Sequence, residues 1–474
     1  MMRSLYSAVS GLKTHQTRMD VIGNNIANVN TEGFKSSAVT FSELMYQTTS
    51  KATSGSGANG IGGVNAKQIG LGVSTGSTTV SITTAGAAET TGNPFDLKLS
   101  DSQTTNFFIV SDGTNTMFTR AGSFYVDGNG YLCMSSTGYK LMGWQVDQTT
   151  GDIRKDTVSS LQVMSAANQT SAPEATTLAY ASGILDKNDK DVATDDGYVL
   201  ALSFFDDLGY SYTSKFAVTE VTDANGNKVE GSYQVALADV LDMNGVSIMY
   251  DENGNLLPGV VPAEMFTTTT INYDTSEGTF AGVNGNPNVT TLDLTISHCG
   301  AFNTGGPDAN GIYDSPFSDI TIDFSSSLNY NNGGTSTFAA TRGDQANGDG
   351  AGKKVGALIG LTVNSDGRIF GSYDNGNTTL LCQIACAQFA NASGLEKVGE
   401  NCYVTTLNSG EFDGVGVEVS ADGSSMSTGE LEMSNVDLSS EFTGMIVTQR
   451  GFQANSRVIT TSDTLLEELI NLKR

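Results

Sequence analysis

The sequence predicts a mainly β protein whose two ends are α-helices that pair with each other as a coiled coil. Apolar residues near both termini recur with helical spacing. Between them, apolar and polar residues alternate with period two, and these stretches are bounded by Asp-Gly and Asn-Gly pairs. The chain has 55 glycines and 7 prolines among its 474 residues, which is typical of many short strands joined by tight turns. A chain of this length favours about two to four domains.

The N-terminal helix is expected over residues 5–29, and the C-terminal helix is expected to begin after an N-cap at Asn435 or Asp437. In both segments apolar residues fall at alternating four- and three-residue steps, with Gln16 and Gly23 among the few exceptions in the first. The apolar side chains expected to form subunit contacts are Leu5, Val9, Leu12, Met19, Ile22, Ile26, Leu438, Phe442, Met445, Phe452, Ile459, Leu466 and Ile470.

Each terminal helix has an apolar stripe that must be covered, and the simplest cover for one is the other. A pair of helices with polar residues in its seam buries too little apolar area to be stable alone. We therefore expect the rest of the stripe to pack against further copies of the chain, which predicts a polymer.

The middle of the chain reads as β structure, with clear period-two stretches at 107–111, 200–205 and 320–324. Residues 48–67 are rich in Ser, Thr and Gly and read as an arm or linker. The expected division is a helical coiled-coil domain of 1–32 plus 434–474, a linker and extended arm of 33–88, a discontinuous β domain of 89–148 plus 354–433, and one or two outer β-rich domains within 149–353.

The formal charge of −27 disfavours nucleic acid as a partner, because a phosphate backbone would be repelled. No stretch approaches the roughly 18 apolar residues of a membrane helix, and the first residues lack the apolar core of a cleaved signal peptide. We therefore expect no membrane insertion, and either a cytoplasmic location or export that leaves the N-terminus intact.

The sequence contains few residues that could form a catalytic site. The two histidines are His15, expected on the flank of the first helix, and His298, whose neighbour Cys299 should point to the opposite face of an expected strand. The other cysteines, at positions 133, 382, 386 and 402, do not have the spacing of a redox pair or zinc site. We interpret all five as buried, inert thiols, and expect no catalytic residues.

Cofactor and metal motifs also fail on inspection. The Gly70, Gly72 and Gly76 triplet has its third glycine one residue late and is followed by strand-like sequence. The segments that start at Asp223 and Asp251 begin like calcium loops, but they lack the required glycine and the final glutamate. We interpret both as turns and expect neither a cofactor nor a metal.

Residues 20–35, with the sequence DVIGNNIANVNTEGFK, closely resemble the N-terminal signature of the flagellar rod and hook proteins. Residues 431–438 and 449–456 resemble the C-terminal signature of the same family, and residues 91–97, 118–124 and 389–395 resemble its β-domain blocks. The signature residues singled out are Gly23, Asn24, Asn25, Asn28, Gly33, Phe34, Asn435, Asp437, Gln449, Arg450 and Asn455. We expect Gly23 to let a neighbouring helix approach.

The resemblance implies a structural subunit of the flagellar hook, a flexible helical tube that transmits torque from the rod to the filament. It further implies homopolymerisation, contacts with the hook cap, the distal rod and the hook-filament junction proteins, and extracellular delivery by the flagellar export apparatus without a cleaved signal peptide. The long middle of the chain favours the hook over a rod subunit. Lys98 and the five cysteines depart from the family pattern and leave local packing open.

Two alternatives remain at this stage. One is a distal rod subunit with a large insertion, which would form part of a rigid shaft. The other is a secreted β-rich adhesin, which would explain the middle of the chain but neither terminal signature.

Overall fold

A computed structural model describes residues 2–55, 62–147, 150–224, 226–296 and 316–472. The chain forms two compact units. Unit 1 comprises Met1–Asn168, Leu361–Gly371 and Thr379–Arg474, and unit 2 comprises Gln169–Gly360 and Ser372–Thr378. The predicted fold class is confirmed, because the described residues are mainly β with an α-helix at each end. His298 and Cys299 lie outside the described residues.

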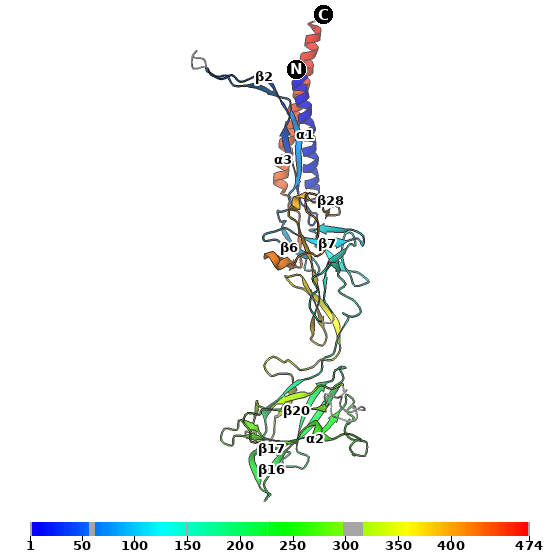
Figure 1. Ribbon diagram of the computed structural model, residues 1–474, viewed down its shortest axis with the longest axis vertical. Helices are drawn as coiled ribbons and strands as arrows, with labels where there is room; N and C mark the ends of the chain where they lie inside the picture. Colours follow the sequence, from blue (N-terminus) through cyan, green and yellow to red (C-terminus); the bar gives the residue numbers. More distant parts are fainter. Residues whose placement is uncertain (1, 56–61, 148–149, 225, 297–315, 473–474) are drawn as a thin grey trace. The chain divides into compact units, whose positions relative to one another are not determined.

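The terminal helices of unit 1 are α1 (Met2–Ala27) and α3 (Leu438–Asn471), and they lie side by side (Figure 1). Asp437 is the N-cap of α3, and its carboxylate accepts a 2.9 Å hydrogen bond from the Ser439 backbone N–H. This resolves the choice between the two predicted caps.

Strands within residues 37–50 and 67–80 form two antiparallel ribbons that follow α1 in sequence. The first pairs β1 with β4 and contacts α1, and the second pairs β2 with β3. The bounds are β1 (Ser37–Glu43), β2 (Tyr46–Ser50), β3 (Lys67–Gly70) and β4 (Val73–Val80). The expected arm thus contains regular strand pairs.

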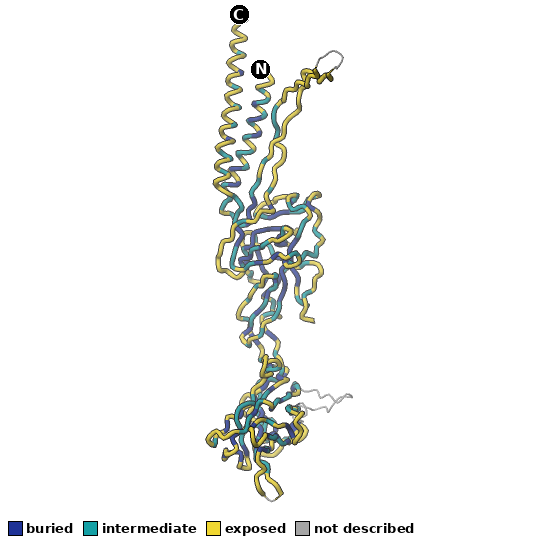
Figure 2. Tube along the Cα trace, turned by 90° about the vertical axis from the view of Figure 1, so that its left-hand side faces the viewer, coloured by how far each residue is buried: buried dark blue, intermediate teal, exposed yellow. Residues whose placement is uncertain are grey.

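The β domain of unit 1 is built on a sheet with the order β26-β11-β7-β8-β29-β28. Two small strand pairs, β5 with β31 and β6 with β30, join residues near the N-terminus to the segment that leads into α3. Figure 2 shows the buried residues concentrated in this domain rather than in the helices. Its strands are β5 (Ala88–Thr90), β6 (Leu97–Ser100), β7 (Asn106–Ser111), β8 (Thr116–Thr119), β9 (Phe124–Val126), β10 (Leu132–Met134), β11 (Lys140–Gln145), β12 (Ser159–Ser160), β27 (Cys386–Gln388), β28 (Glu396–Gly399), β29 (Cys402–Val404), β30 (Ser425–Thr428) and β31 (Glu430–Glu432), with the 3-10 helices η2 (Ala392–Gly394) and η3 (Val419–Asp422).

Unit 2 contains an antiparallel meander, β15-β16-β17-β18-β19, and a second sheet in which β14 pairs in parallel with β21 and β22. In β15, Leu200, Leu202 and Phe204 are buried while the residues between them are more exposed, as a half-buried strand requires. The elements are β13 (Thr170–Ser171), β14 (Leu178–Ile184), β15 (Tyr198–Phe205), β16 (Ser211–Thr222), β17 (Lys228–Leu241), α2 (Pro262–Met265), β18 (Thr269–Tyr273), β19 (Phe280–Val283), β20 (Thr291–Leu294), β21 (Ile320–Asp323), β22 (Ser327–Leu328) and β23 (Ala339–Arg342).

Three strands contain residues of both units: β24 (Gly356–Val363), β25 (Arg368–Tyr373) and β26 (Thr378–Ile384). The period-two stretches predicted at 107–111, 200–205 and 320–324 coincide with β7, β15 and β21, which confirms them as strands.

Candidate assembly interface

The contact between α1 and α3 is antiparallel and is made mainly by small and polar residues. A Cβ atom added at Gly11 would lie 2.8 Å from Nδ2 of Asn455, and one added at Gly451 would lie 2.7 Å from the His15 ring. Near the other end of α1, Asn25 donates a 2.8 Å hydrogen bond from Nδ2 to Oε1 of Glu441. Each step forward along α1 is matched by an equal step backward along α3.

This contact row lies one residue before the predicted stripe on both helices. On α1 it includes Ala8 and Gly11, and on α3 it includes Thr448 and Gly451, where the stripe pointed to the residue that follows each of them. Ile22, one of the predicted apolar side chains, lies in the row itself and is buried. A shift of one residue turns a helix face by about 100°. Small side chains in the row let the two backbones approach closely.

The apolar side chains expected at subunit contacts are therefore only partly covered within one chain. Of these thirteen, Ile22 is buried, Leu5, Leu12, Met19, Ile26, Met445, Ile459 and Leu466 are half-buried, and Val9, Leu438, Phe442, Phe452 and Ile470 are exposed. The helix pair thus presents large apolar side chains on the faces that the other helix does not cover.

The β1–β4 ribbon covers a second face of α1. The Val73 backbone N–H donates to Oγ of Ser10 at 3.2 Å, and the Phe41 ring packs edge-on against His15 with 5.4 Å between ring centroids. Burial, together with the nearby Arg18 charge, lowers the pKa of His15 and favours the neutral ring. His15 is therefore packed between α3 and the ribbon.

The N-terminal signature residues mostly fix the chain where α1 ends. Asn25 is buried and also bonds the Ser37 backbone in both directions, at 2.8 and 3.0 Å. The Asn28 amide donates to the Asn24 side chain at 2.6 Å; Asn24 lies on the last turn of α1 and Asn28 directly follows the helix. Gly33 has a φ of +66°, and a Cβ atom there would lie 2.6 Å from the Ala121 backbone nitrogen, so only glycine fits.

Two other residues of this signature complete the picture. Phe34 is buried beneath the Lys397 ammonium, which lies 4.4 Å from the ring centroid. Gly23 is exposed, and no described atom lies within 4 Å of the position of its Cβ. The expected close approach of a helix is therefore not made at Gly23 within one chain; Gly11 and Gly451 serve that purpose.

The C-terminal signature divides between anchoring and exposed positions. Asn435 accepts a 2.8 Å hydrogen bond from the Ser36 backbone and donates to the Ser81 carbonyl at 2.8 Å. Asn455 packs against α1, whereas Gln449 and Arg450 are exposed on α3. The exposed pair is free to meet another molecule.

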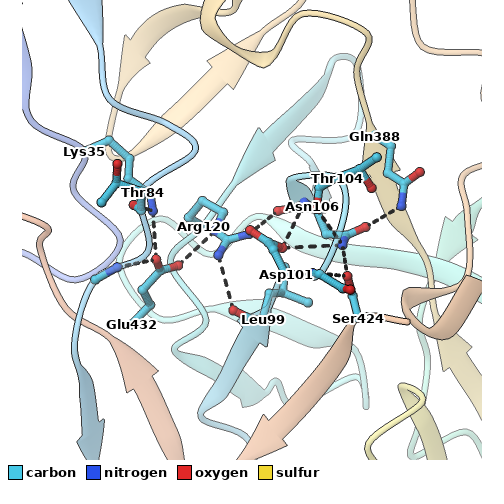
Figure 3. A network of polar contacts seen from close by, with 12 residues as sticks. Lys35, Thr84, Leu99, Asp101, Thr104, Asn106, Arg120, Gln388, Ser424 and Glu432 are labelled. Atoms are coloured by element: carbon cyan, nitrogen blue, oxygen red, sulfur yellow. Dashed lines mark hydrogen bonds and ion pairs between the residues drawn. The ribbon is translucent and has the colours of Figure 1, made fainter. Parts of the chain in front are cut away.

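A buried polar network ties both ends of the chain to the β domain (Figure 3). Glu432 on β31 lies 2.8 Å from Nζ of Lys35 and 2.9 Å from Nε of Arg120. Arg120 in turn bonds both carboxylate oxygens of Asp101, at 3.0 and 2.9 Å. The side chains of Lys35, Arg120 and Glu432 are at most 1% exposed, so their charges must be balanced within the protein.

Electrostatics and hydrogen bonds favour the ionised form of Glu432. Burial works to raise the pKa of Glu432, but the Arg120 guanidinium and the Lys35 ammonium outweigh it and hold that pKa below its usual value. The Gly86 backbone N–H also donates to Oε1 of Glu432 at 2.9 Å. Two positive and two negative groups, contributed by three distant parts of the sequence, thus form one neutral cluster.

Sequence reasoning did not single out this network, although its members lie in or next to the quoted blocks. Lys35 ends the N-terminal signature, Arg120 lies in the block 118–124, and Glu432 lies in the block 431–438. A charged residue inside an otherwise apolar or small block is the signal that could have found it.

The four described thiols are buried, and the acidic segment at Asp251 forms a turn. Cys133, Cys382, Cys386 and Cys402 are buried and unpaired, and burial raises the pKa of Cys382 to about 12. The prediction of buried thiols is confirmed for these four. The Asp251 carboxylate accepts hydrogen bonds from backbone N–H groups two and four residues on, at 2.9 and 2.8 Å, which confirms a turn.

Across the described ranges, no cluster of three or more His, Cys, Asp or Glu side chains is placed to hold a metal ion. None of the described helices is both long enough and apolar enough to span a membrane.

Comparison with known proteins gives two matches to family models, one at each end. Residues 5–35 match the family described as flagella basal body rod protein, and residues 427–472 match the family described as flagellar basal body rod FlgEFG protein C-terminal.

Full-length relatives are found as well. The chain is 34% identical to the flagellar hook protein FlgE of Treponema pallidum and 35% identical to that of Borreliella burgdorferi, with 100% of each chain covered in both cases. It is 28% identical to the flagellar basal-body rod protein FlgG of Bacillus subtilis, again with 100% of each chain covered.

Proposed function

The chain belongs to the flagellar hook proteins, and we propose that its copies polymerise through the terminal helix pair into the flexible tube that transmits torque from rod to filament. Membership of this family makes it a structural protein of the bacterial flagellum and not an enzyme. These relatives do not favour the adhesin alternative. The rod alternative is not favoured, because the full-length identities of 34% and 35% to hook proteins exceed the 28% to a rod protein.

The observation that carries this proposal is the distribution of side chains on the helix pair. The row between α1 and α3 is made largely of small and polar residues, whereas Phe442 and Ile446 are 51% and 58% exposed. Exposed apolar side chains of this size mark a protein contact surface. An identical contact repeated without closure builds an open helical tube.

Flexibility is assigned to the rest of the chain. A bending tube needs outer contacts that lengthen and shorten, and small polar interfaces tolerate this better than large apolar ones. The chain passes between unit 1 and unit 2 at 168/169, 360/361, 371/372 and 378/379. We infer that the terminal helices hold the copies together and that unit 2 sets the bending stiffness of the tube.

The remaining partners follow from the family resemblance. We propose contacts with the hook cap during growth, with the distal rod below and with the hook-filament junction proteins above. We also propose delivery to the cell exterior by the flagellar export apparatus, with no cleaved signal peptide.

Two experiments test this function. Cells that lack the gene should yield hook-basal bodies with complete rods and no hooks. Hooks of normal shape would instead favour the alternative that the chain is a rod subunit. Deletion of residues 438–474 should abolish tube formation by the purified chain while the β domain stays folded by circular dichroism. Tubes formed by the truncated chain would contradict the role of the helices.

A further inference from the structure

Seven Asn-Gly pairs lie in the described part of the chain. Such a pair can modify itself, because glycine has no Cβ to hinder attack by its backbone nitrogen on the asparagine side chain. In six of the pairs the glycine N–H already donates a hydrogen bond of 2.8–3.0 Å, which must break before the nitrogen can react. These glycines are Gly130, Gly245, Gly254, Gly333, Gly348 and Gly376.

The seventh pair, Asn284-Gly285, lies in a different kind of turn directly after β19. The Val283 N–H donates to the Asn286 carbonyl at 3.3 Å, and the Asn286 N–H donates to the Val283 carbonyl at 2.8 Å. Asn284 and Gly285 have φ values of +51° and +74°, as the centre of a type I′ hairpin turn requires. Both are exposed, and none of the described residues accepts a hydrogen bond from the Gly285 N–H. The Gly285 nitrogen is therefore available to react.

The side-chain carbonyl of Asn284 is polarised by a neighbouring strand. The Asn284 N–H donates to the Thr270 carbonyl at 2.7 Å, and the Thr270 N–H donates to Oδ1 of Asn284 at 3.1 Å. A fixed backbone N–H at a carbonyl oxygen stabilises the negative charge that develops there when a nucleophile attacks the carbon. The Thr270 N–H is thus placed to stabilise attack on Cγ of Asn284.

We propose that Asn284 is the first of these seven asparagines to be modified in the folded chain, by conversion to aspartate and isoaspartate. The Gly285 nitrogen forms a bond to Cγ of Asn284, the bond from Cγ to Nδ2 breaks, and Nδ2 leaves as ammonia with the proton from the Gly285 nitrogen. Water then adds to either carbonyl of the resulting succinimide and opens the ring. One water is consumed, one ammonia is released, and nothing is oxidised or reduced.

The modification weakens one edge of unit 2. β19 is the last strand of the meander, and it pairs with β18 next to this turn. Isoaspartate lengthens the main chain of the turn by one carbon atom, which a two-residue turn cannot accommodate while it keeps the pairing with Thr270. The site needs only one folded chain, so the proposal does not depend on polymerisation.

Peptide mapping by mass spectrometry, after incubation of the full-length chain in mildly alkaline buffer, measures conversion at each asparagine. Alkaline buffer promotes the reaction because the attacking nitrogen must lose its proton. The matched site is Asn253, which is also exposed in unit 2, but the Gly254 N–H donates to the Asp251 carbonyl at 3.0 Å. Asn284 should be converted about fivefold faster than Asn253 or more, since about fivefold is the rate factor that one typical net hydrogen bond provides.

The chain unfolded in urea is the control, because there the seven pairs differ only in their neighbouring residues. The preference for Asn284 should shrink under these conditions. A rate at Asn284 no higher than that at Asn253 in the folded chain, or an equally large preference in urea, would overturn the assignment. Either result would leave the proposed hook function standing, and a chain that formed no tubes would leave this site standing.

Discussion

Replacing Glu432 by glutamine should destabilise unit 1 strongly, although the side chain keeps its shape. Glu432 is 1% exposed and balances two buried cations, Lys35 at 2.8 Å and Arg120 at 2.9 Å. Removing one partner of a buried ion pair costs about 3–5 kcal/mol, because the remaining charge stays buried. Asp101 still neutralises part of Arg120, so we expect the lower end of this range, about 3 kcal/mol.

Thermal unfolding followed by circular dichroism measures this effect. A loss of about 3 kcal/mol should lower the Tm by roughly 6–12 °C for a domain of 150–250 residues. The matched control is Glu430→Gln on the same strand, since Glu430 is 33% exposed and lies 3.9 Å from Lys98. A partly exposed pair of this kind contributes less than about 1 kcal/mol. Equal shifts for the two variants would refute the reasoning.

The pH dependence supplies a second check with a defined sign. Because the folded protein holds the pKa of Glu432 below its usual value, this group stabilises the fold above the ordinary glutamate pKa of about 4.3. That contribution is lost as the pH falls through the folded pKa. The difference in unfolding free energy between parent and Glu432→Gln should therefore be largest at neutral pH and shrink in acid; a difference that grew in acid would contradict the assigned charge state.

Three further changes have definite expectations. Gly11→Leu should disrupt the contact between the terminal helices and lower their helical signal on heating, whereas Gly23→Leu, with open space around it, should leave the isolated chain intact. Gly33→Ala should lower the unfolding free energy by more than about 1 kcal/mol, because Gly33 has a positive φ and faces the backbone at Ala121. Gly113 also has a positive φ but has no atom within 4 Å of its Cβ position, so Gly113→Ala should lower the unfolding free energy only by the backbone strain. Urea titrations of the two variants measure the difference. The Cys382 thiol should resist alkylation until the protein unfolds, because it is buried and burial raises its pKa to about 12; rapid labelling of the native chain at this residue, mapped by mass spectrometry, would count against this.

The sequence pattern was sufficient to predict the helices and strands, but it did not predict which faces of α1 and α3 contact each other. Helical spacing identified both terminal helices, and period-two alternation identified strands such as β15. The same spacing placed the seam at the large apolar residues, because hydrophobic periodicity counts apolar side chains and does not distinguish a contact within the chain from one between chains. The actual row runs through residues such as Gly11 and Thr448, which an apolar count passes over.

The buried network was hidden for a different reason. With 51 acidic residues in the chain, no carboxylate stands out as the partner of Lys35 or Arg120. The contacts join distant parts of the sequence, since Arg120 and Glu432 are 312 positions apart, and the strand that carries Glu432 pairs with β5. Such long-range pairing follows from strand register and cannot be read from local sequence.

The choice of side chains between the helices has a physical consequence for assembly. If the large apolar residues of α1 and α3 faced each other, the single chain would bury them and little driving force would remain for association. Small residues such as Gly11 and Gly451 instead allow a close helix pair at low cost in apolar area, while Phe442 and its neighbours stay outside. The buried network then supplies the attachment that the thin helix contact lacks, by fixing the segments that lead into and out of the helices at Lys35 and Glu432. A subunit built in this way can stay folded as a single chain and still hold most of its apolar contact area for the next copy.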